Sequence, residues 1–283
     1  MKIIAESGAT KTAWRSVCED GTVRQALTEG LNPSCLDAGD IRVAVRKAVP
    51  QLNPEGRMVS DVFFYGAGLV DEKTSGPIRD ALQMWCPLAQ IHFHTDLMAA
   101  ARALFGDGSG IVAIMGTGSN SCLYQNGTIV RNIRPGGFIL GDEGGAVSLG
   151  KAFLSDYIKG LVPQEIASAF DGRYGLTYPD IVRKVYHEPA AAAFMASLAP
   201  FIMEYVADAY ISDMVRGCLG EFVRRTLSRY VGDGEKCAVG VVGSFGCACR
   251  DILCEVGRRY GVEFVRFVQS PIDVLVKYHT HGI

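Results

Sequence analysis

The chain has 283 residues, a formal net charge of −2 and 48% hydrophobic residues. This length exceeds the usual size of one domain, so we expect two domains, each with its own core. Lys and Arg are scattered without a basic stripe and no apolar stretch reaches the length of a membrane span, which argues against nucleic acid and membrane partners. The expected partners are small molecules or other protein chains.

Nine cysteines, an odd number, follow no regular framework. Most lie in apolar segments, which favours reduced thiols packed as small apolar residues. The segment 1–6 lacks the charged-then-apolar pattern of a secretion signal, so a cytoplasmic location is expected. Cys247, Cys249 and Cys254 form the one cluster, but their spacing differs from that of common zinc sites, and their role stays open.

Short apolar runs alternate with turn residues in the first third of the chain. An Asp-Gly pair at 20–21 favours a hairpin, so three antiparallel strands are predicted to open the first domain. The predicted elements are strands at 1–5, 13–18 and 22–28, a helix at 38–49, a strand at 59–65, a helix at 75–85, a strand at 90–94 and a helix at 96–105.

The same order of elements begins again after Gly110, with an Asn-Gly hairpin signal at 126–127. The predicted elements are strands at 111–115, 119–124 and 128–132, a long helical region at about 143–230, a strand at 237–242, a helix at 247–260, a strand at 263–268 and a helix at 270–279. This recurrence predicts an internal structural duplication. The glycine-rich segment 105–110 is the best boundary between the copies.

Two loops rich in glycine and threonine, Glu6 to Thr12 and Gly116 to Asn120, lie at the same point of the repeated unit. Glycine lets backbone N–H groups approach an anion and the hydroxyls add donors, so each loop could cradle a phosphate. Each alone could equally be an ordinary turn. A third element, Gly243 to Gly246, could face an anion or a base, or could be only a tight strand-to-helix connection.

Acidic and amide side chains lie close to these glycines. Asp96 joins a predicted strand to a predicted helix, where it could be an N-cap or a general base for a hydroxyl that attacks phosphorus. Gly141-Asp-Glu-Gly144 places two acids at a helix start, where acids also complement the helix dipole. Asn32, Asn120 and Asp142 would suit a ligand with many hydroxyl groups.

In this order, the segments 5–12, 116–120, 136–144 and 243–246 resemble the N-acetylglucosamine kinase branch of the BadF/BadG/BcrA/BcrD ATPase family. That family belongs to the superfamily of actin, heat-shock chaperones and sugar kinases, and the resemblance covers essentially the whole chain. It implies an α/β fold of two ribonuclease H-like (actin-like ATPase) domains with a duplicated βββαβαβα core and an interdomain cleft. The expected domains are 1–107, closed by a C-terminal helix at 270–283, and 108–269, with a helical insertion at about 143–230.

The resemblance also implies roles for single residues. Asp96 matches the catalytic base, and Glu6, where much of the superfamily has Asp, is the candidate metal residue, acting on Mg²⁺ through water. The positions that match nucleotide contacts are Gly8, Thr10, Lys11, Thr117, Gly243 and Ser244. Those that match sugar contacts are Asn32, Ser119, Asn120, Gly136, Gly137 and Asp142.

The implied function is ATP-dependent phosphorylation of an amino sugar, with the 6-hydroxyl of N-acetylglucosamine as the leading expectation and ATP and Mg²⁺ as cofactors. One alternative is an ATPase that energises a partner enzyme, as the activators of acyl-CoA dehydratases and reductases do with a shared iron–sulfur cluster. Another is a non-catalytic sugar sensor. The close cysteines lie near the adenosine element, which disfavours a cluster. The identity of the sugar stays open, and a homodimer is the commonest oligomeric state of soluble enzymes.

Overall fold

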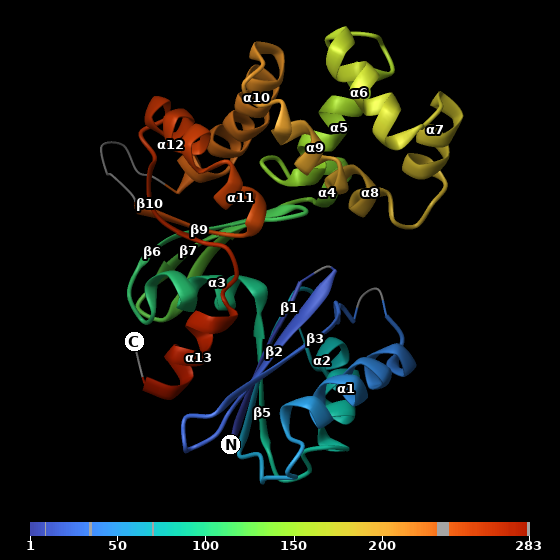
Figure 1. Ribbon diagram of the computed structural model, residues 1–283. Coiled ribbons are helices and arrows are strands. Elements are labelled where there is room, and N and C mark those ends of the chain that lie inside the picture. Colours follow the sequence, from blue (N-terminus) through green and yellow to red (C-terminus); the bar gives the residue numbers. More distant parts are fainter. Residues whose placement is uncertain (9, 34–35, 70, 231–237, 282–283) are drawn as a thin grey trace. The chain divides into compact units, whose positions relative to one another are not determined.

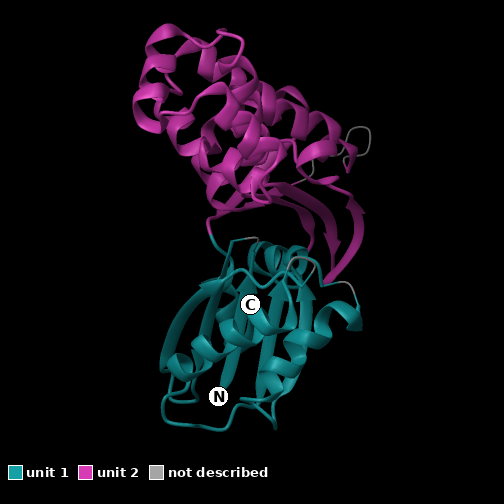
Figure 2. Cartoon of the chain, turned by 90° about the vertical axis from the view of Figure 1, so that its right-hand side faces the viewer, with its two compact units in different colours: residues 1–108, 270–283 teal, residues 109–269 magenta. Residues whose placement is uncertain are grey.

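The computed structural model describes residues 1–8, 10–33, 36–69, 71–230 and 238–281 (Figure 1). The chain divides into two compact units, unit 1 with Met1–Gly108 and Ser270–Ile283, and unit 2 with Ser109–Gln269 (Figure 2). Each unit is built on one five-stranded mixed sheet with helices packed on it. The α/β class expected from the sequence is therefore confirmed.

The sheet of unit 1 has the strand order β3-β2-β1-β4-β5. Its strands are β1 (Lys2–Ser7), β2 (Lys11–Val17), β3 (Val23–Glu29), β4 (Asp61–Gly66) and β5 (Gln90–Thr95). The first three strands pair antiparallel, whereas β4 pairs parallel to both β1 and β5. Because parallel strands end at the same edge of a sheet, the chain leaves β1, β4 and β5 at one edge.

Helices cover both faces of this sheet. The helices α1 (Ala38–Leu52) and α2 (Glu72–Gln83) share a core with Ile3, Trp14 and Phe64 on one face. The helices α3 (Asp96–Phe105) and α13 (Ile272–His281) pack with Ile4 and Tyr65 on the other face. Successive residues of β1 therefore pack into the cores on opposite faces of the sheet, because successive side chains of a strand point to opposite faces.

The sheet of unit 2 repeats this arrangement, with the strand order β10-β9-β6-β7-β8. Its strands are β6 (Gly110–Met115), β7 (Ser119–Gln125), β8 (Thr128–Ile133), β9 (Ala238–Val242) and β10 (Glu263–Val268). The strands β6, β7 and β8 pair antiparallel, and β9 pairs parallel to β6 and β10. Since strand order and direction match those of unit 1, the duplication predicted from the sequence is confirmed.

Most helices of unit 2 lie between β8 and β9. They share one apolar core with the sheet, in which the rings of Phe153, Phe170 and Phe201 meet at edge-to-face or tilted angles. The helices of this unit are α4 (Gly137–Leu140), α5 (Ala146–Tyr157), α6 (Gln164–Tyr174), α7 (Tyr178–Tyr186), α8 (Ala191–Ser197), α9 (Ala199–Glu204), α10 (Ala209–Arg225), η1 (Leu227–Arg229), α11 (Ser244–Ala248) and α12 (Arg250–Arg259). Within the described ranges, no helix has both the length and the apolar character needed to cross a membrane.

Several element boundaries differ from the sequence-based expectation. The predicted helix at 247–260 is two helices, α11 and α12, which meet at Cys249. The first helix does not end at Val49 but continues through Pro50, since a proline near the end of a helix removes only one backbone hydrogen bond. Cys35 and Cys237, the latter at the start of a predicted strand, lie outside the described residues.

The hairpin predicted at Asn126 and Gly127 is confirmed, because both residues have positive φ angles of 48° and 80°. Positive φ at both central positions gives the turn that matches the twist of the paired strands.

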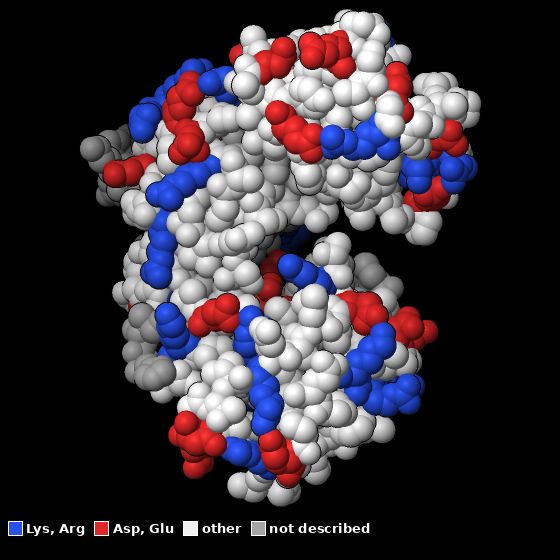
Figure 3. All heavy atoms as spheres, in the orientation of Figure 1, with Lys and Arg blue, Asp and Glu red and all other residues white. Residues whose placement is uncertain are grey.

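On the face of the molecule in Figure 3, Lys and Arg side chains are interspersed with Asp and Glu in both units.

Candidate active site

The first glycine loop is shorter than the sequence suggests, because β1 extends to Ser7 and β2 begins at Lys11. The Gly8 N–H donates to the Lys11 carbonyl at 3.0 Å and closes a tight turn. Thr10 and Lys11 are exposed on it, and Ala9 lies outside the described residues. The three candidate nucleotide residues of unit 1 thus sit on a turn that presents a hydroxyl and an ammonium group to solvent.

Two buried hydroxyl groups fix the base of this turn, and the sequence analysis missed their role. Thr12 Oγ1 lies 2.9 Å from Ser7 Oγ and 2.9 Å from the Glu29 carbonyl oxygen. The Leu31 N–H donates to Ser7 Oγ at 2.8 Å, so the segment that leads to Asn32 is tied to the same two side chains. Polar residues at inward positions of alternating strands were the signal that could have revealed this network.

Asp96 is the first residue of α3, and it is not the N-cap. Thr95 occupies the cap position, and its Oγ1 accepts a hydrogen bond from the Met98 N–H at 3.2 Å. The Asp96 carboxylate accepts one from the neighbouring Leu97 N–H at 2.8 Å. The N-cap interpretation of Asp96 is therefore wrong, and a threonine supplies the cap instead.

The register of the parallel strands explains how Glu6 and Asp96 come to interact. Ser7 of β1 pairs with Gly66 of β4, which in turn pairs with Thr95 of β5. Glu6 and Asp96 therefore lie at the same edge of the sheet, each next to one of these paired residues. They are close enough for the charge of Asp96 to affect the pKa of Glu6.

Both carboxyl groups have raised pKa values. Burial, reinforced by the charge of Asp96 and opposed by Lys11, raises the pKa of Glu6 to about 7. Burial also raises the pKa of Asp96, against the effect of the hydrogen bond from the Leu97 N–H. Because two carboxylates near each other repel, ionisation of both is disfavoured, and a nearby cation would favour their charged forms.

The raised pKa of Glu6 gives a testable dependence of stability on pH. Since its folded-state pKa exceeds the ordinary value of 4.5, the folded protein holds the proton more tightly than the unfolded chain. The free energy of unfolding therefore falls as pH rises from 4.5 to about 7. We expect Glu6→Gln to reduce this fall by on the order of 2 kcal/mol, measured by urea unfolding without divalent cations.

Glu19→Gln, at an exposed position of the same unit, is the matched control and should leave the pH dependence of stability in place. Parallel curves for Glu6→Gln and the unmodified protein would show that the pKa of Glu6 is not raised in the folded protein.

The second glycine loop, in unit 2, is anchored by its backbone. The Gly116 N–H donates to the Gly118 carbonyl at 3.0 Å. The carbonyls of Gly116 and Thr117 accept from the N–H groups of Ala146 and Val147, both at 2.9 Å. These carbonyl groups therefore provide hydrogen-bond acceptors for backbone N–H groups in the first turn of α5, which has no side-chain cap.

Gly118 lies directly against Asp142. A Cβ atom at Gly118 would lie 2.6 Å from Asp142 Oδ2, and one at Gly145 would lie 2.6 Å from the Gly118 carbonyl carbon. Asp142 has a positive φ of 58°, and burial raises its pKa. The loop at 116–120 and the Gly141–Gly144 turn are thus one packed structure.

The hydroxyl and amide groups next to Gly118 already have partners. Ser119 Oγ donates to the Glu143 carbonyl at 2.7 Å. Asn120 Oδ1 accepts from the Ser121 N–H at 2.9 Å and from Asn132 Nδ2 at 3.0 Å. The orientations of the Ser119 and Asn120 side chains are therefore fixed by the protein itself.

The third glycine element lies against the start of the second loop. Gly243 has a φ of 128°, and a Cβ atom there would lie 2.2 Å from the Met115 carbonyl oxygen and 3.2 Å from the Gly116 nitrogen. Its N–H donates to the Val268 carbonyl at 2.9 Å, and Ser244 begins α11. Unit 2 thus brings Thr117 and the Gly243-Ser244 pair to the ends of neighbouring strands.

The candidate sugar residues Gly136 and Gly137 begin a compact turn that ends at Asp142. Both have positive φ angles, of 82° and 71°. The Asp142 N–H donates to the Pro135 carbonyl at 3.2 Å, and a Cβ atom at Gly141 would lie only 1.7 Å from that same oxygen. The close approach of Pro135 and Gly141 brings the two glycines next to Asp142.

Each unit therefore gathers part of the candidate site. Unit 1 brings together Glu6, Asp96 and the turn of Gly8 to Lys11, and unit 2 brings together Thr117, Asp142 and Gly243. Asn32 belongs to unit 1, whereas the other candidate sugar residues belong to unit 2.

Comparisons with known proteins show which family and fold the chain shares. No family model and no curated protein matches the chain. A solved structure from Porphyromonas gingivalis, named as a candidate N-acetylglucosamine kinase, is 33% identical over 100% of both chains, with a TM-score of 0.92. The chain belongs to this N-acetylglucosamine kinase-like family.

Two further structures share the fold of the family. A candidate N-acetylglucosamine kinase from Chromobacterium violaceum is 20% identical over 96% of both chains, with a TM-score of 0.74. A glucokinase from Streptomyces griseus, solved with glucose and AMPPNP, is 18% identical over 95% of this chain and 94% of its own, with a TM-score of 0.56. The family therefore has the two-domain fold of actin-like ATPases and sugar kinases.

Proposed function

We propose that this protein is an ATP-dependent sugar kinase that phosphorylates an amino sugar, with the 6-hydroxyl of N-acetylglucosamine as the acceptor. The observation that carries the proposal is the partly buried Asp96 carboxylate, whose charge acts on Glu6 next to the first glycine turn, in a member of this family. Phosphoryl transfer depends on positioning and on charge neutralisation, and both require such fixed polar groups.

Asp96 has the chemistry of a general base. Burial raises its pKa above that of an ordinary aspartate, so the carboxylate is a stronger base and accepts a proton more readily. In the proposed reaction it takes the proton of the sugar hydroxyl as that oxygen attacks the γ-phosphorus of ATP. The bond from this phosphorus to the β–γ bridging oxygen breaks, and ADP leaves.

The acidic pair in unit 1 also fits a magnesium ion. Two partly buried carboxyl groups provide oxygen ligands of the kind that Mg²⁺ prefers, often through water. The charge of the cation would offset the burial that raises their pKa values. Glu6 would hold the ion, which would neutralise charge on the ATP phosphates. Lys11, exposed on the neighbouring turn, would contribute positive charge to the same phosphates.

Unit 2 would supply the remaining contacts. In the proposal, Thr117 binds a phosphate while Gly243 and Ser244 face the adenosine. Asp142, on the packed turn beside Gly118, accepts hydrogen bonds from sugar hydroxyls. Because Ser119 and Asn120 already have partners that fix them, they can bind the sugar without a further loss of side-chain freedom.

A coupled assay of ADP release with a panel of sugars tests the function. We expect turnover with N-acetylglucosamine at least about tenfold faster than with glucose, N-acetylmannosamine or glucosamine, which corresponds to about 1.4 kcal/mol of discrimination. Mass spectrometry and NMR of the product would locate the phosphate on the 6-oxygen. Absence of a phosphorylated product from every amino sugar would refute the kinase proposal.

Among the described residues, the surroundings of Cys249 argue against the alternative of an iron–sulfur ATPase. Cys249 is buried, its Sγ lies 4.0 Å from Met203 Sδ, and burial raises the pKa of its thiol to about 12. Such a thiol strongly resists the deprotonation that cluster ligation requires.

A further inference from the structure

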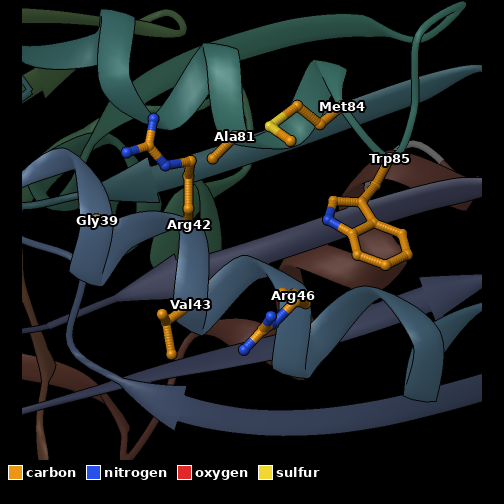
Figure 4. Close-up of a pocket in the computed structure, with 7 residues that line it drawn as sticks. All are labelled: Gly39, Arg42, Val43, Arg46, Ala81, Met84 and Trp85. Atoms are coloured by element: carbon orange, nitrogen blue, oxygen red, sulfur yellow. The ribbon is translucent and has the colours of Figure 1, made fainter.

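A pocket outside the candidate active site opens between the helices α1 and α2 of unit 1 (Figure 4). Its volume is about 420 Å³, which is in the range of small-molecule sites. It is lined by Gly39, Arg42, Val43, Arg46, Ala81, Met84 and Trp85. These helices cover the face of the sheet opposite to α3, the helix that begins with Asp96.

The pocket exposes an unusual amount of apolar and aromatic surface. The exposed fraction is 43% for Trp85 and 71% for Met84, whereas Ala81 is buried. The other tryptophan, Trp14, is completely buried in the core of the same unit. An exposed indole beside a hollow provides a flat surface on which another ring can stack.

Two arginines give the pocket its charge. Arg42 and Arg46 are exposed and one helical turn apart on α1. In Figure 4 the Arg42 side chain extends toward α2, the Arg46 side chain extends in a different direction from the next turn, and Met84 and Trp85 lie just after the end of α2. Across the part of the chain that the structure describes, neither forms an ion pair. Guanidinium groups bind phosphate through paired N–H donors, so this pair is complementary to an anion.

We propose that the pocket binds a nucleoside monophosphate, with the base stacked on the Trp85 indole and the phosphate held by Arg42 and Arg46. An aromatic platform and two arginines on one small cavity match the two chemically different ends of such a ligand. Gly39 and Ala81 in its lining have little or no side chain and leave room in the cavity, whose volume suits a compact ligand better than an extended peptide. This site is separate from the residues proposed for catalysis.

Tryptophan fluorescence tests the proposal with uridine 5′-monophosphate as the probe. Because the chain has two tryptophans and Trp14 is buried, saturable quenching reports on Trp85. We expect the double substitution Arg42→Gln with Arg46→Gln to weaken binding at least about tenfold. Lys73→Gln with Lys277→Gln makes the same change of charge at exposed positions of unit 1 and should leave the affinity unchanged.

Separate titrations with uridine and with inorganic phosphate distinguish the two ends of the ligand, and each should bind far more weakly than the whole nucleotide. Thr117→Ala, which alters the proposed ATP site in unit 2, should not change the affinity for the probe. The proposal is overturned if the probe does not quench, if the double arginine variant binds equally well, or if phosphate alone binds as tightly as the nucleotide.

Discussion

Asp96→Asn is expected to lower kcat about 10³-fold while the affinity for the sugar changes by less than about threefold. An amide has nearly the same shape as a carboxylate but cannot take a proton from the attacking hydroxyl. The Leu97 N–H can still donate to the amide oxygen, so the start of α3 should keep its structure. Steady-state kinetics together with calorimetric sugar binding would measure both quantities.

A measurement of the stability of Asp96→Asn distinguishes the loss of the catalytic base from a loss of folding. Because burial disfavours the charged form of Asp96, the neutral asparagine should leave the free energy of unfolding at pH 7 unchanged or increased. Asp273→Asn, at an exposed aspartate of the same unit, is the control and should leave kcat unchanged. A kcat for Asp96→Asn within tenfold of the unmodified enzyme would remove Asp96 from the role of base.

Gly243→Ala is expected to destabilise the protein by about 3 to 5 kcal/mol and to abolish detectable ATP binding. The new Cβ atom would lie 2.2 Å from the Met115 carbonyl oxygen, and the φ of 128° is rarely adopted by residues with a side chain. The clash would push α11 away from β6, next to Thr117. Urea unfolding and equilibrium binding of ATP would measure the two effects.

Gly172→Ala is the matched control for this substitution. A Cβ atom at Gly172, in the last turn of α6, would meet nothing within 4 Å. Alanine there should stabilise the helix by about 0.5 to 1 kcal/mol, because glycine loses more backbone entropy on folding. If both variants unfolded at the same urea concentration, the close approach of Gly243 to Met115 would be refuted.

Local sequence patterns were sufficient for most of the fold. Alternating apolar residues marked the strands, and the Asn126-Gly127 pair marked a hairpin that the structure contains. The recurrence of three strands with a glycine loop predicted the duplication, because each copy carries its own pattern. Boundaries were less certain: Thr95 rather than Asp96 caps α3, since two adjacent residues can both accept the same kind of hydrogen bond.

What the sequence determined by itself was the order of the elements and the glycine positions, because strand alternation and turn chemistry depend on near neighbours. The tertiary structure alone decided which side chains interact. Glu6 and Asp96 influence each other only because parallel pairing through β4 brings their strand ends to one edge of the sheet. Gly118 needs to be glycine only because Asp142 packs against it, and such contacts between residues distant in the chain leave no local pattern.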